Sequence, residues 1–360
     1  MLNLRGKEQC AWDVLSLGEV MVRFDPGEQR IATTRTFRVW EGGGEYNVAR
    51  ALRRCFRQRS TVVTALVDNS VGRLLEDLML QGGVDLSHVL WKDFDGIGRE
   101  ARNGVYFLER GFGSRPAMGM MDRAHTAVSQ LQPGTVDWDS IFGNEGVRWF
   151  HTGGIMCALS DTSADVVREA MAAAKRHGVI VSYDCNYRPS LWRDKGGRLA
   201  ASRMNRALAP MVDVLLGHDG DLAAEVCAAS GGPPWHTAES YAAMAERIVT
   251  DFPNIQSIAT TVRRVHTANR NDWGAFGWMG GEVRQSMEFP NLEILDRVGG
   301  GDAFAAGLFY GLMEGNDLKW SLDCGVAHGA LAMTTAGDAS VATLAEVIHA
   351  MDSKGTHVQR

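Results

Sequence analysis

Residues 296–307 read Asp-Arg-Val-Gly-Gly-Gly-Asp-Ala-Phe-Ala-Ala-Gly, and this stretch says most about the chain. Three consecutive glycines, Gly299, Gly300 and Gly301, run into Asp302 and an Ala-rich segment that favours a helix. Glycines let backbone N–H groups converge without a Cβ in the way, and a helix start adds unpaired donors and a positive dipole. The stretch therefore predicts a cradle for the anionic oxygens of a phosphate.

Asp302 stands beside this predicted cradle. A carboxylate repels a phosphate ligand, so its presence indicates a chemical role, namely taking a proton from an alcohol that attacks the phosphoryl group. Aspartate is also a favoured N-cap, and glycines before a helix often mark only a tight turn. The segment alone leaves both interpretations open.

The composition is that of a globular protein with a large core. The chain has 360 residues, 45% of them hydrophobic and 22% charged, which excludes disorder as the dominant state. A net charge of −6 without a long Lys/Arg run gives no footprint for nucleic acid or an anionic membrane. The six cysteines lack metal-ligand spacing, and no apolar run is long enough to span a bilayer. We therefore expect reduced thiols and a cytoplasmic location.

Apolar strand-like runs alternate with segments of helical period, which is typical of a mostly parallel sheet flanked by helices. We expect one α/β domain over residues 1–360. The expected strands are 14–24, 61–67, 147–152, 179–184, 212–216, 255–260 and 274–278. The expected helices are 47–56, 71–81, 161–177, 238–251, 302–314, 318–334 and 343–351.

Two segments depart from this alternation. Residues 98–123 are rich in Gly, Arg, Met and aromatics, contain a strand-like run at 104–110 and show no helical pattern. Together with residues from about 19 to 41 they predict a small β-sheet that covers a binding cleft as a lid. Such a sheet has free edges that could pair with a second subunit, so we expect a homodimer through the lid strands.

No P-loop pattern GxxxxGK[ST] occurs, and no Rossmann GxGxxG follows the first strand. The missing Rossmann pattern disfavours a nicotinamide dehydrogenase, and a nucleotide would have to bind at the late glycine stretch.

An early glycine cluster at 42–44 is followed by Asn47. Gly43 and Gly44 would permit close approach of a polyol, and Asn47 offers a donor and acceptors to hydroxyls. A glycine-rich turn with Asn47 as a cap is an equal alternative.

These two glycine sites, with an aspartate at the late one, resemble the signatures of the ribokinase-like (PfkB) carbohydrate kinases. The late family signature is D-T-x-G-A-G-D, with Arg297 here in place of Thr and Gly300 in place of Ala. The early signature G-G-A-x-x-N-x-A is matched by residues 42–49. The resemblance covers nearly the whole chain. Further segments are similar to the 2-keto-3-deoxygluconate kinases of this family, at 18–24, 150–155, 158–160 and 184–192.

The resemblance implies a ribokinase-like fold and a phosphoryl transfer. Carried over residue by residue, it makes Asp302 the catalytic base and the amides of Gly299, Gly300 and Gly301 the anion hole. Magnesium-bound ATP would be the phosphoryl donor, and no metal-ligating residues are predicted on the protein itself. The acceptor would be a sugar acid, most closely 2-keto-3-deoxygluconate, phosphorylated at its primary hydroxyl.

Arg188 is the residue that most bears on substrate class. It follows the expected strand 179–184, at the edge where open α/β sheets bind ligands. A guanidinium can hold a carboxylate through two parallel hydrogen bonds, which a neutral sugar would not require. The resemblance places Arg188 on the acid sugar. A surface arginine paired with Asp184 or Asp194 is the alternative.

The resemblance also implies substrate contacts from Tyr106 and Asp338. Here the sequence departs from the family pattern Tyr-x-Arg, because Leu108 occupies the position of that arginine. Only Arg110, which alternates onto the same face of the strand, could compensate.

The nucleotide side departs further from the family pattern. The usual Asn-x-x-Glu around the metal and phosphates aligns poorly with residues 217–221, where Asp219 or Asp221 would take the acidic role. We expect ATP contacts from His218, Thr261 and Arg263, besides Gly299 and Gly301. Two other functions stay open: a kinase for a neutral sugar of the fructose or ribose type, and a catalytically weak sensor of sugar acids.

Overall fold

The computed structural model describes residues 2–218 and 237–352. Ten strands form its larger sheet: β1 (Trp12–Leu17), β4 (Ser60–Val67), β5 (Val89–Lys92), β8 (Val147–Gly153), β9 (Ile180–Asp184), β10 (Val214–His218), β11 (Ser257–Thr267), β12 (Arg270–Met279), β13 (Glu282–Gln285) and β14 (Phe289–Glu293). They are ordered β13-β12-β11-β10-β9-β8-β1-β4-β5, with β14 paired to β12. All pairs from β11 to β5 are parallel, and the pairs made by β12 are antiparallel. The predicted mostly parallel sheet is confirmed.

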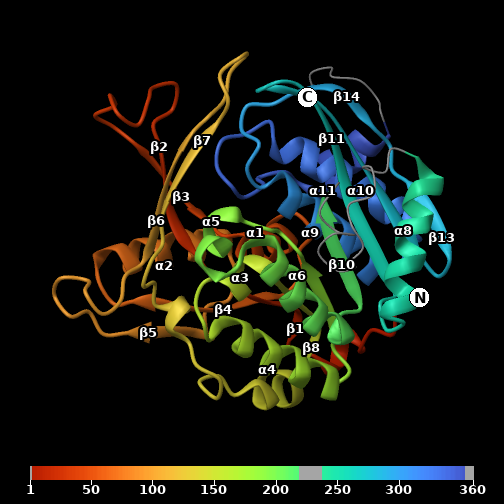
Figure 1. Cartoon of the computed structure of the whole chain (residues 1–360), viewed down its shortest axis with the longest axis horizontal. Coiled ribbons are helices and arrows are strands. Elements are labelled where there is room, and N and C mark those ends of the chain that lie inside the picture. Colours follow the sequence, from red (N-terminus) through yellow and green to blue (C-terminus); the bar gives the residue numbers. More distant parts are fainter. Residues whose placement is uncertain (1, 219–236, 353–360) are drawn as a thin grey trace.

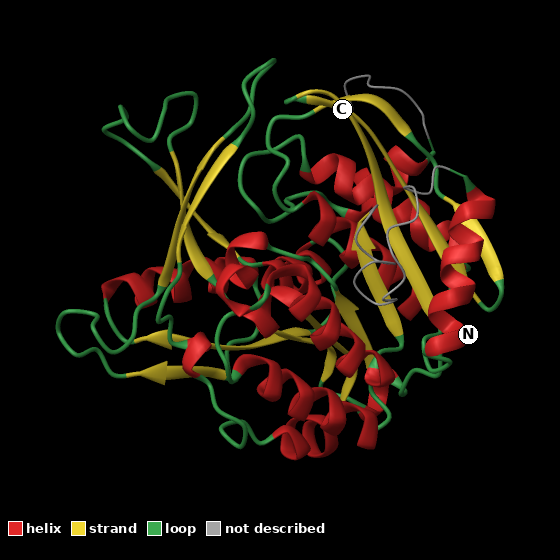
Figure 2. Cartoon of the chain, in the orientation of Figure 1, coloured by secondary structure: helices red, strands yellow, loops and turns green. Residues whose placement is uncertain are grey.

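Helices cover both faces of this sheet (Figure 2). One face packs on α1 (Gly44–Arg54), α9 (Gly300–Met313), α10 (Leu318–Ala332) and α11 (Leu344–Met351). The other face packs on α3 (Gly154–Ala158), α4 (Ser163–Arg176), α6 (Gly197–Leu208) and α8 (Ala238–Asp251). Successive side chains of a strand point to opposite faces, so Val214 joins the first core and Leu215 the second. No helix within the described ranges is long and apolar enough to cross a membrane.

A separate small sheet stands away from the larger one, at the upper left of Figure 1. It contains β2 (Met21–Asp25), β3 (Arg38–Gly42), β6 (Gly104–Glu109) and β7 (Met118–Asp122), in the order β3-β2-β6-β7. These strands come from the two segments that departed from the alternation. The helix α2 (Ser70–Gly82) packs beneath the small sheet, where its Leu75 and Met79 join a third core with Val22.

The prediction of one strand over residues 14–24 is wrong. The chain leaves the larger sheet after Leu17 and enters the small sheet at Met21. Gly18 lies at the break, and a Cβ there would stand 2.3 Å from the Glu45 carboxylate, so α1 passes too close for any other residue. The helix expected from residue 302 also begins earlier, at Gly300.

A buried ion cluster joins the small sheet to the loops around α9 and α10. Arg23 of β2 is fully buried and donates to Asp25 at 3.0 Å, to Asp338 at 2.7 Å and to Asp296. The hydroxyl of Tyr106, from β6, also donates to Asp338. One guanidinium therefore fixes two strands of the small sheet against the segment before α9 and the loop after α10.

Replacing Arg23 by Met is expected to cost about 3–5 kcal/mol of stability, because it leaves buried carboxylates without their cation. Urea unfolding measures this loss. Arg284→Met is the matched control, since Arg284 pairs with Glu282 at an exposed site and should contribute less than about 1 kcal/mol. Equal losses in the two variants would show that the cluster does not stabilise the junction.

Candidate active site

A cavity of about 610 Å³ lies between the small sheet and the carboxyl ends of the central parallel strands. The small sheet contributes Met21, Tyr106 and Leu108 to its wall. All but one of the candidate site residues from the sequence line it: Gly43, Gly44, Asn47, Tyr106, Arg188, Thr261, Arg263, Gly299, Gly300, Gly301, Asp302 and Asp338. Residues up to 295 positions apart in the sequence thus meet at one site.

The remaining candidate, His218, ends β10 and pairs in register with Thr261 of β11. Its side chain lies outside the described part of the structure, as do Asp219 and Asp221. On this edge of the sheet the described lining residues include Leu216, Gly217, Thr261 and Arg263.

The three glycines form a turn with free donors at the start of α9. Gly299 has a φ of +81°, and a Cβ on it would stand 1.7 Å from the Asp338 carbonyl oxygen, so only glycine fits here. Among the described residues, none accepts a hydrogen bond from the N–H groups of Gly299, Gly300 or Gly301. Those donors and the helix dipole make a cradle for an anion, as the sequence predicted.

Asp302 lies in the first turn of α9 and faces the cavity. The N-cap of the helix is Gly299, so the alternative of Asp302 as a cap is wrong. The Asn47 side-chain amide donates to Asp302 Oδ2 at 2.8 Å. Burial raises the pKa of Asp302 to about 7, against this hydrogen bond and the charge of Arg188, which lower it. A carboxyl with a pKa near neutrality is suited to accept a proton.

Asn47 is linked to Asp302 and does not act as a cap. Asn47 lies inside α1, and the N-cap of this helix is Gly43. The alternative of a glycine-rich turn with Asn47 as the helix cap is therefore wrong. The Oδ1 atom of Asn47 is buried and has no hydrogen-bond donor among the described residues. This leaves an unused acceptor next to the candidate base.

Arg188 begins the short helix α5 (Pro189–Trp192) and lines the cavity from the side of β9. Its guanidinium makes no hydrogen bond or ion pair with another described residue. The alternative of a surface pair with Asp184 or Asp194 is therefore wrong. An exposed, unpaired cation at a cavity wall is suited to bind an anionic ligand.

Tyr106 and Asp338 line the cavity, but the Tyr106 hydroxyl donates to the Asp338 carboxylate. Arg110 does not replace the missing arginine at position 108. It lies 3.6 Å from Asp25 in an ion pair and does not line the cavity. The expectation that Arg110 could compensate is wrong, because its guanidinium pairs with Asp25 of the neighbouring strand β2 and does not reach the cavity.

Three further charged residues of the wall had no role predicted from the sequence. Glu45 is buried among Asp302, Asp184 and Arg123, and its burial raises its pKa to about 8. Glu19 accepts from Arg123 Nε at 2.8 Å and from Thr126 at 2.7 Å, which fixes the end of β7. Only the fold brings these residues to the cavity.

Comparison with known proteins agrees with this geometry. Residues 12–344 match the model of the pfkB family carbohydrate kinases. The chain belongs to this family. It is 31% identical to the 2-dehydro-3-deoxygalactonokinase of Haloferax volcanii, over 93% of this chain and 95% of the relative. It is 29% identical to the 2-dehydro-3-deoxygluconokinase of Thermoproteus tenax, over 93% of each chain.

The crystal structure of the 2-dehydro-3-deoxygluconokinase from Thermotoga maritima superposes with a TM-score of 0.86 at 31% identity. The match covers 94% of this chain and 99% of the other. The expected ribokinase-like fold and carbohydrate kinase activity are confirmed, and the relatives make it a kinase of the sugar-acid type.

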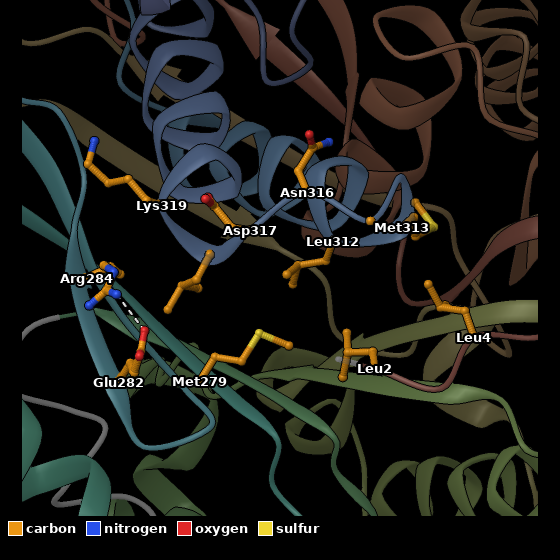
Figure 3. Close-up of a pocket in the computed structure, with 12 residues that line it drawn as sticks. Leu2, Leu4, Met279, Glu282, Arg284, Leu312, Met313, Asn316, Asp317 and Lys319 are labelled. Carbon is orange, nitrogen blue, oxygen red and sulfur yellow. Dashed lines mark hydrogen bonds and ion pairs between the residues drawn. The ribbon is translucent and has the colours of Figure 1, made fainter.

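A second cavity, of about 450 Å³, lies at the opposite end of α9 (Figure 3). Its floor is apolar, with Leu2, Leu4, Met279 and Leu312, and an exposed Arg284–Glu282 ion pair lies at its rim. The 14 residues of α9 place it roughly 20 Å from the glycine cradle. None of the candidate site residues from the sequence lines this second cavity.

Replacing Asp302 by Asn is expected to lower kcat roughly 10²–10⁴-fold, the usual contribution of a general base. The wild-type kcat/KM should fall on the acid side of about pH 7, where Asp302 becomes protonated. Initial rates from pH 5 to 9 measure both effects. Turnover of the Asn variant near the wild-type level would reject Asp302 as the base.

The same substitution should raise stability at alkaline pH. The pKa of Asp302 is higher in the folded chain than in the unfolded one, so its ionisation destabilises the fold as the pH rises from about 4 through about 7. Asp302→Asn removes this penalty, and its Tm should exceed the wild-type Tm at pH 8 by more than at pH 5. Asp93→Asn, at an exposed carboxyl, is the control and should show no such difference.

Proposed function

We propose that this kinase transfers the γ-phosphoryl group of ATP to the primary hydroxyl of a sugar acid, 2-keto-3-deoxygluconate. One observation carries the proposal: Asp302 lies beside three free backbone amides in a cavity whose wall also holds the unpaired cation of Arg188. The relatives named for 2-dehydro-3-deoxygluconate and its galacto isomer support the same substrate class.

The reaction needs few protein groups. The substrate hydroxyl oxygen attacks the γ-phosphorus, its proton passes to Asp302, and the bond from that phosphorus to the ADP oxygen breaks. The amides of Gly299, Gly300 and Gly301 hold the oxygens of the phosphoryl group in transfer. Asn47 positions Asp302 through the 2.8 Å hydrogen bond.

The donor would be ATP carrying Mg²⁺, which neutralises charge on the phosphates. The glycine turn fits a phosphate group, because no described residue accepts a hydrogen bond from its three amides and a Cβ at Gly301 would meet no atom within 4 Å. Within the described ranges no cluster of three or more ligating side chains is placed to hold a metal ion. Thr261, Arg263 and His218 are the proposed contacts on the nucleotide side.

The small sheet is proposed as a lid, formed by residues from about 19 to 41 and 98–123 of a single domain. Tyr106, Leu108, Gly119 and Met121 line the cavity from it. Closing over the substrate would exclude water, which otherwise accepts the phosphoryl group. The buried free cysteines of the described chain support the expectation of a reducing, cytoplasmic setting.

Arg188→Ala is expected to raise the KM for 2-keto-3-deoxygluconate about 10- to 100-fold, because a charge-assisted contact to the carboxylate is lost. Coupled ADP release across sugar acids, fructose and ribose measures this. Arg193→Ala, at an exposed arginine nearby that does not line the cavity, is the control. Efficient turnover of neutral sugars, unaffected by Arg188→Ala, would favour a neutral-sugar kinase. Tight sugar-acid binding without ADP formation would favour a sensor.

A homodimer through the small sheet is also proposed. The edge strand β7 is exposed along its length, and its outer face presents Met118 and Met120, while Gly119 and Met121 face the cavity. Phe24 and Phe107 extend this apolar outer face, stacked with ring centroids 5.0 Å apart. An unpaired strand edge with an apolar face favours pairing with a second copy.

The double variant Met118→Lys/Met120→Lys is expected to be monomeric where the wild-type chain is dimeric, because paired lysines repel across the edge. Light scattering after size-exclusion chromatography measures the mass. Leu199→Lys changes an exposed leucine on α6 and should leave the mass unchanged. A wild-type monomer, or a dimer that persists in the double variant, would exclude this interface.

A further inference from the structure

Two arginines of the cavity wall have no partner among the described residues. Four arginines line the cavity: Arg123, Arg188, Arg263 and Arg297. Arg123 donates hydrogen bonds to Glu19, and Arg263 also has an interaction partner. The guanidinium groups of Arg188 and Arg297 make no hydrogen bond or ion pair with any other described residue. The function proposed above uses Arg188 and leaves Arg297 without a role.

The backbone on both sides of Arg297 is fixed. Asp296 is held by Arg23 in the buried ion cluster. Val298 packs against Met21, Tyr106 and Leu108 of the small sheet. These contacts fix the backbone position of Arg297, and its side chain lines the cavity.

Arg297 lies next to Leu108, on the side of the small sheet. Besides the main cavity, both residues line one narrow recess together with Arg110, Ala117 and Val298. Leu108 is 7% exposed and brings no charge to the main cavity, and Arg110 pairs with Asp25 and does not line that cavity. The family pattern has an arginine at position 108 of β6, where this chain has Leu108. Arg297, from the loop before the glycine turn, brings a guanidinium to the same wall of the cavity.

We propose that Arg297 is a specificity-determining residue that binds the carboxylate of the sugar acid together with Arg188. This inference rests on the proposed function, since it presupposes an acidic substrate. A carboxylate has two oxygens, and each can accept from a separate guanidinium without competition. The phosphoryl group has its own donors in the glycine amides, so Arg297 is free for the other anionic end of the acceptor.

The test exchanges the two positions. Arg297→Thr removes the guanidinium and keeps a small polar side chain, and Leu108→Arg/Arg297→Thr returns a guanidinium from β6. KM and kcat are measured for 2-keto-3-deoxygluconate, for its neutral amide and for ATP, and binding of the acid without ATP is measured by calorimetry. Arg115→Thr, at an exposed arginine of the β6–β7 turn that lines neither recess nor cavity, is the control.

Arg297→Thr is expected to raise the KM for the acid about 10- to 100-fold and to leave the amide nearly unaffected, so the preference for the acid shrinks. The double variant should recover at least part of this preference, which an unfolded or distorted protein would not. Arg115→Thr should match the wild type.

Three outcomes would overturn the assignment. If Arg297→Thr raises the KM for ATP instead, the arginine binds a nucleotide phosphate. If it weakens acid and amide equally, or if the wild-type preference persists in it, Arg297 does not recognise the carboxylate. A wild-type enzyme without any preference for acid over amide would overturn the proposed function as well, which distinguishes the two failures.

Discussion

One buried guanidinium determines how the two sheets of this kinase are joined. Arg23 satisfies carboxylates of Asp25, Asp296 and Asp338 at a site without solvent exposure, where an unpaired acid would be costly. Asp296 begins the segment that leads to the glycine turn, and the Asp338 carbonyl lies against Gly299. The same cluster that attaches the small sheet therefore also sets the position of the anion-binding amides.

The parts of the site that the sequence predicted are local in the chain. Gly299, Gly300, Gly301 and Asp302 lie within four positions, and their chemistry follows from backbone freedom and a helix start. The helix expected at 161–177 was similarly predictable, and it forms as α4 (Ser163–Arg176). In contrast, the first strand was misjudged because strand-forming apolar residues resume at Val20, directly after Gly18 and Glu19. The break depends on Glu45 passing Gly18, a contact that only the assembled fold reveals.

The partners in the buried cluster could not be predicted for the same reason. Arg23 meets Asp296 across 273 positions and Asp338 across 315. A sequence contains no sign that an arginine in a strand will be fully buried, because most arginines are exposed. Arg110 and Leu108 show how a correct expectation for a strand can still give the wrong contact. The alternation of β6 placed them on one face, but only the fold shows that Arg110 pairs with Asp25 and does not line the main cavity.

The charges of the cavity explain how an anionic sugar and a nucleotide could share it. Five carboxyl groups line the wall, those of Glu19, Glu45, Asp184, Asp302 and Asp338. Glu19 and Asp338 are compensated by Arg123 and Arg23. Glu45 and Asp302, with pKa values of about 8 and about 7, hold protons over much of the neutral range. The resting cavity is thus less negative than its composition indicates, and the unpaired Arg188 and Arg297 can act on an incoming anion. A cation bound nearby would lower the pKa of Asp302 and favour the ionised carboxylate that its proposed role as base requires.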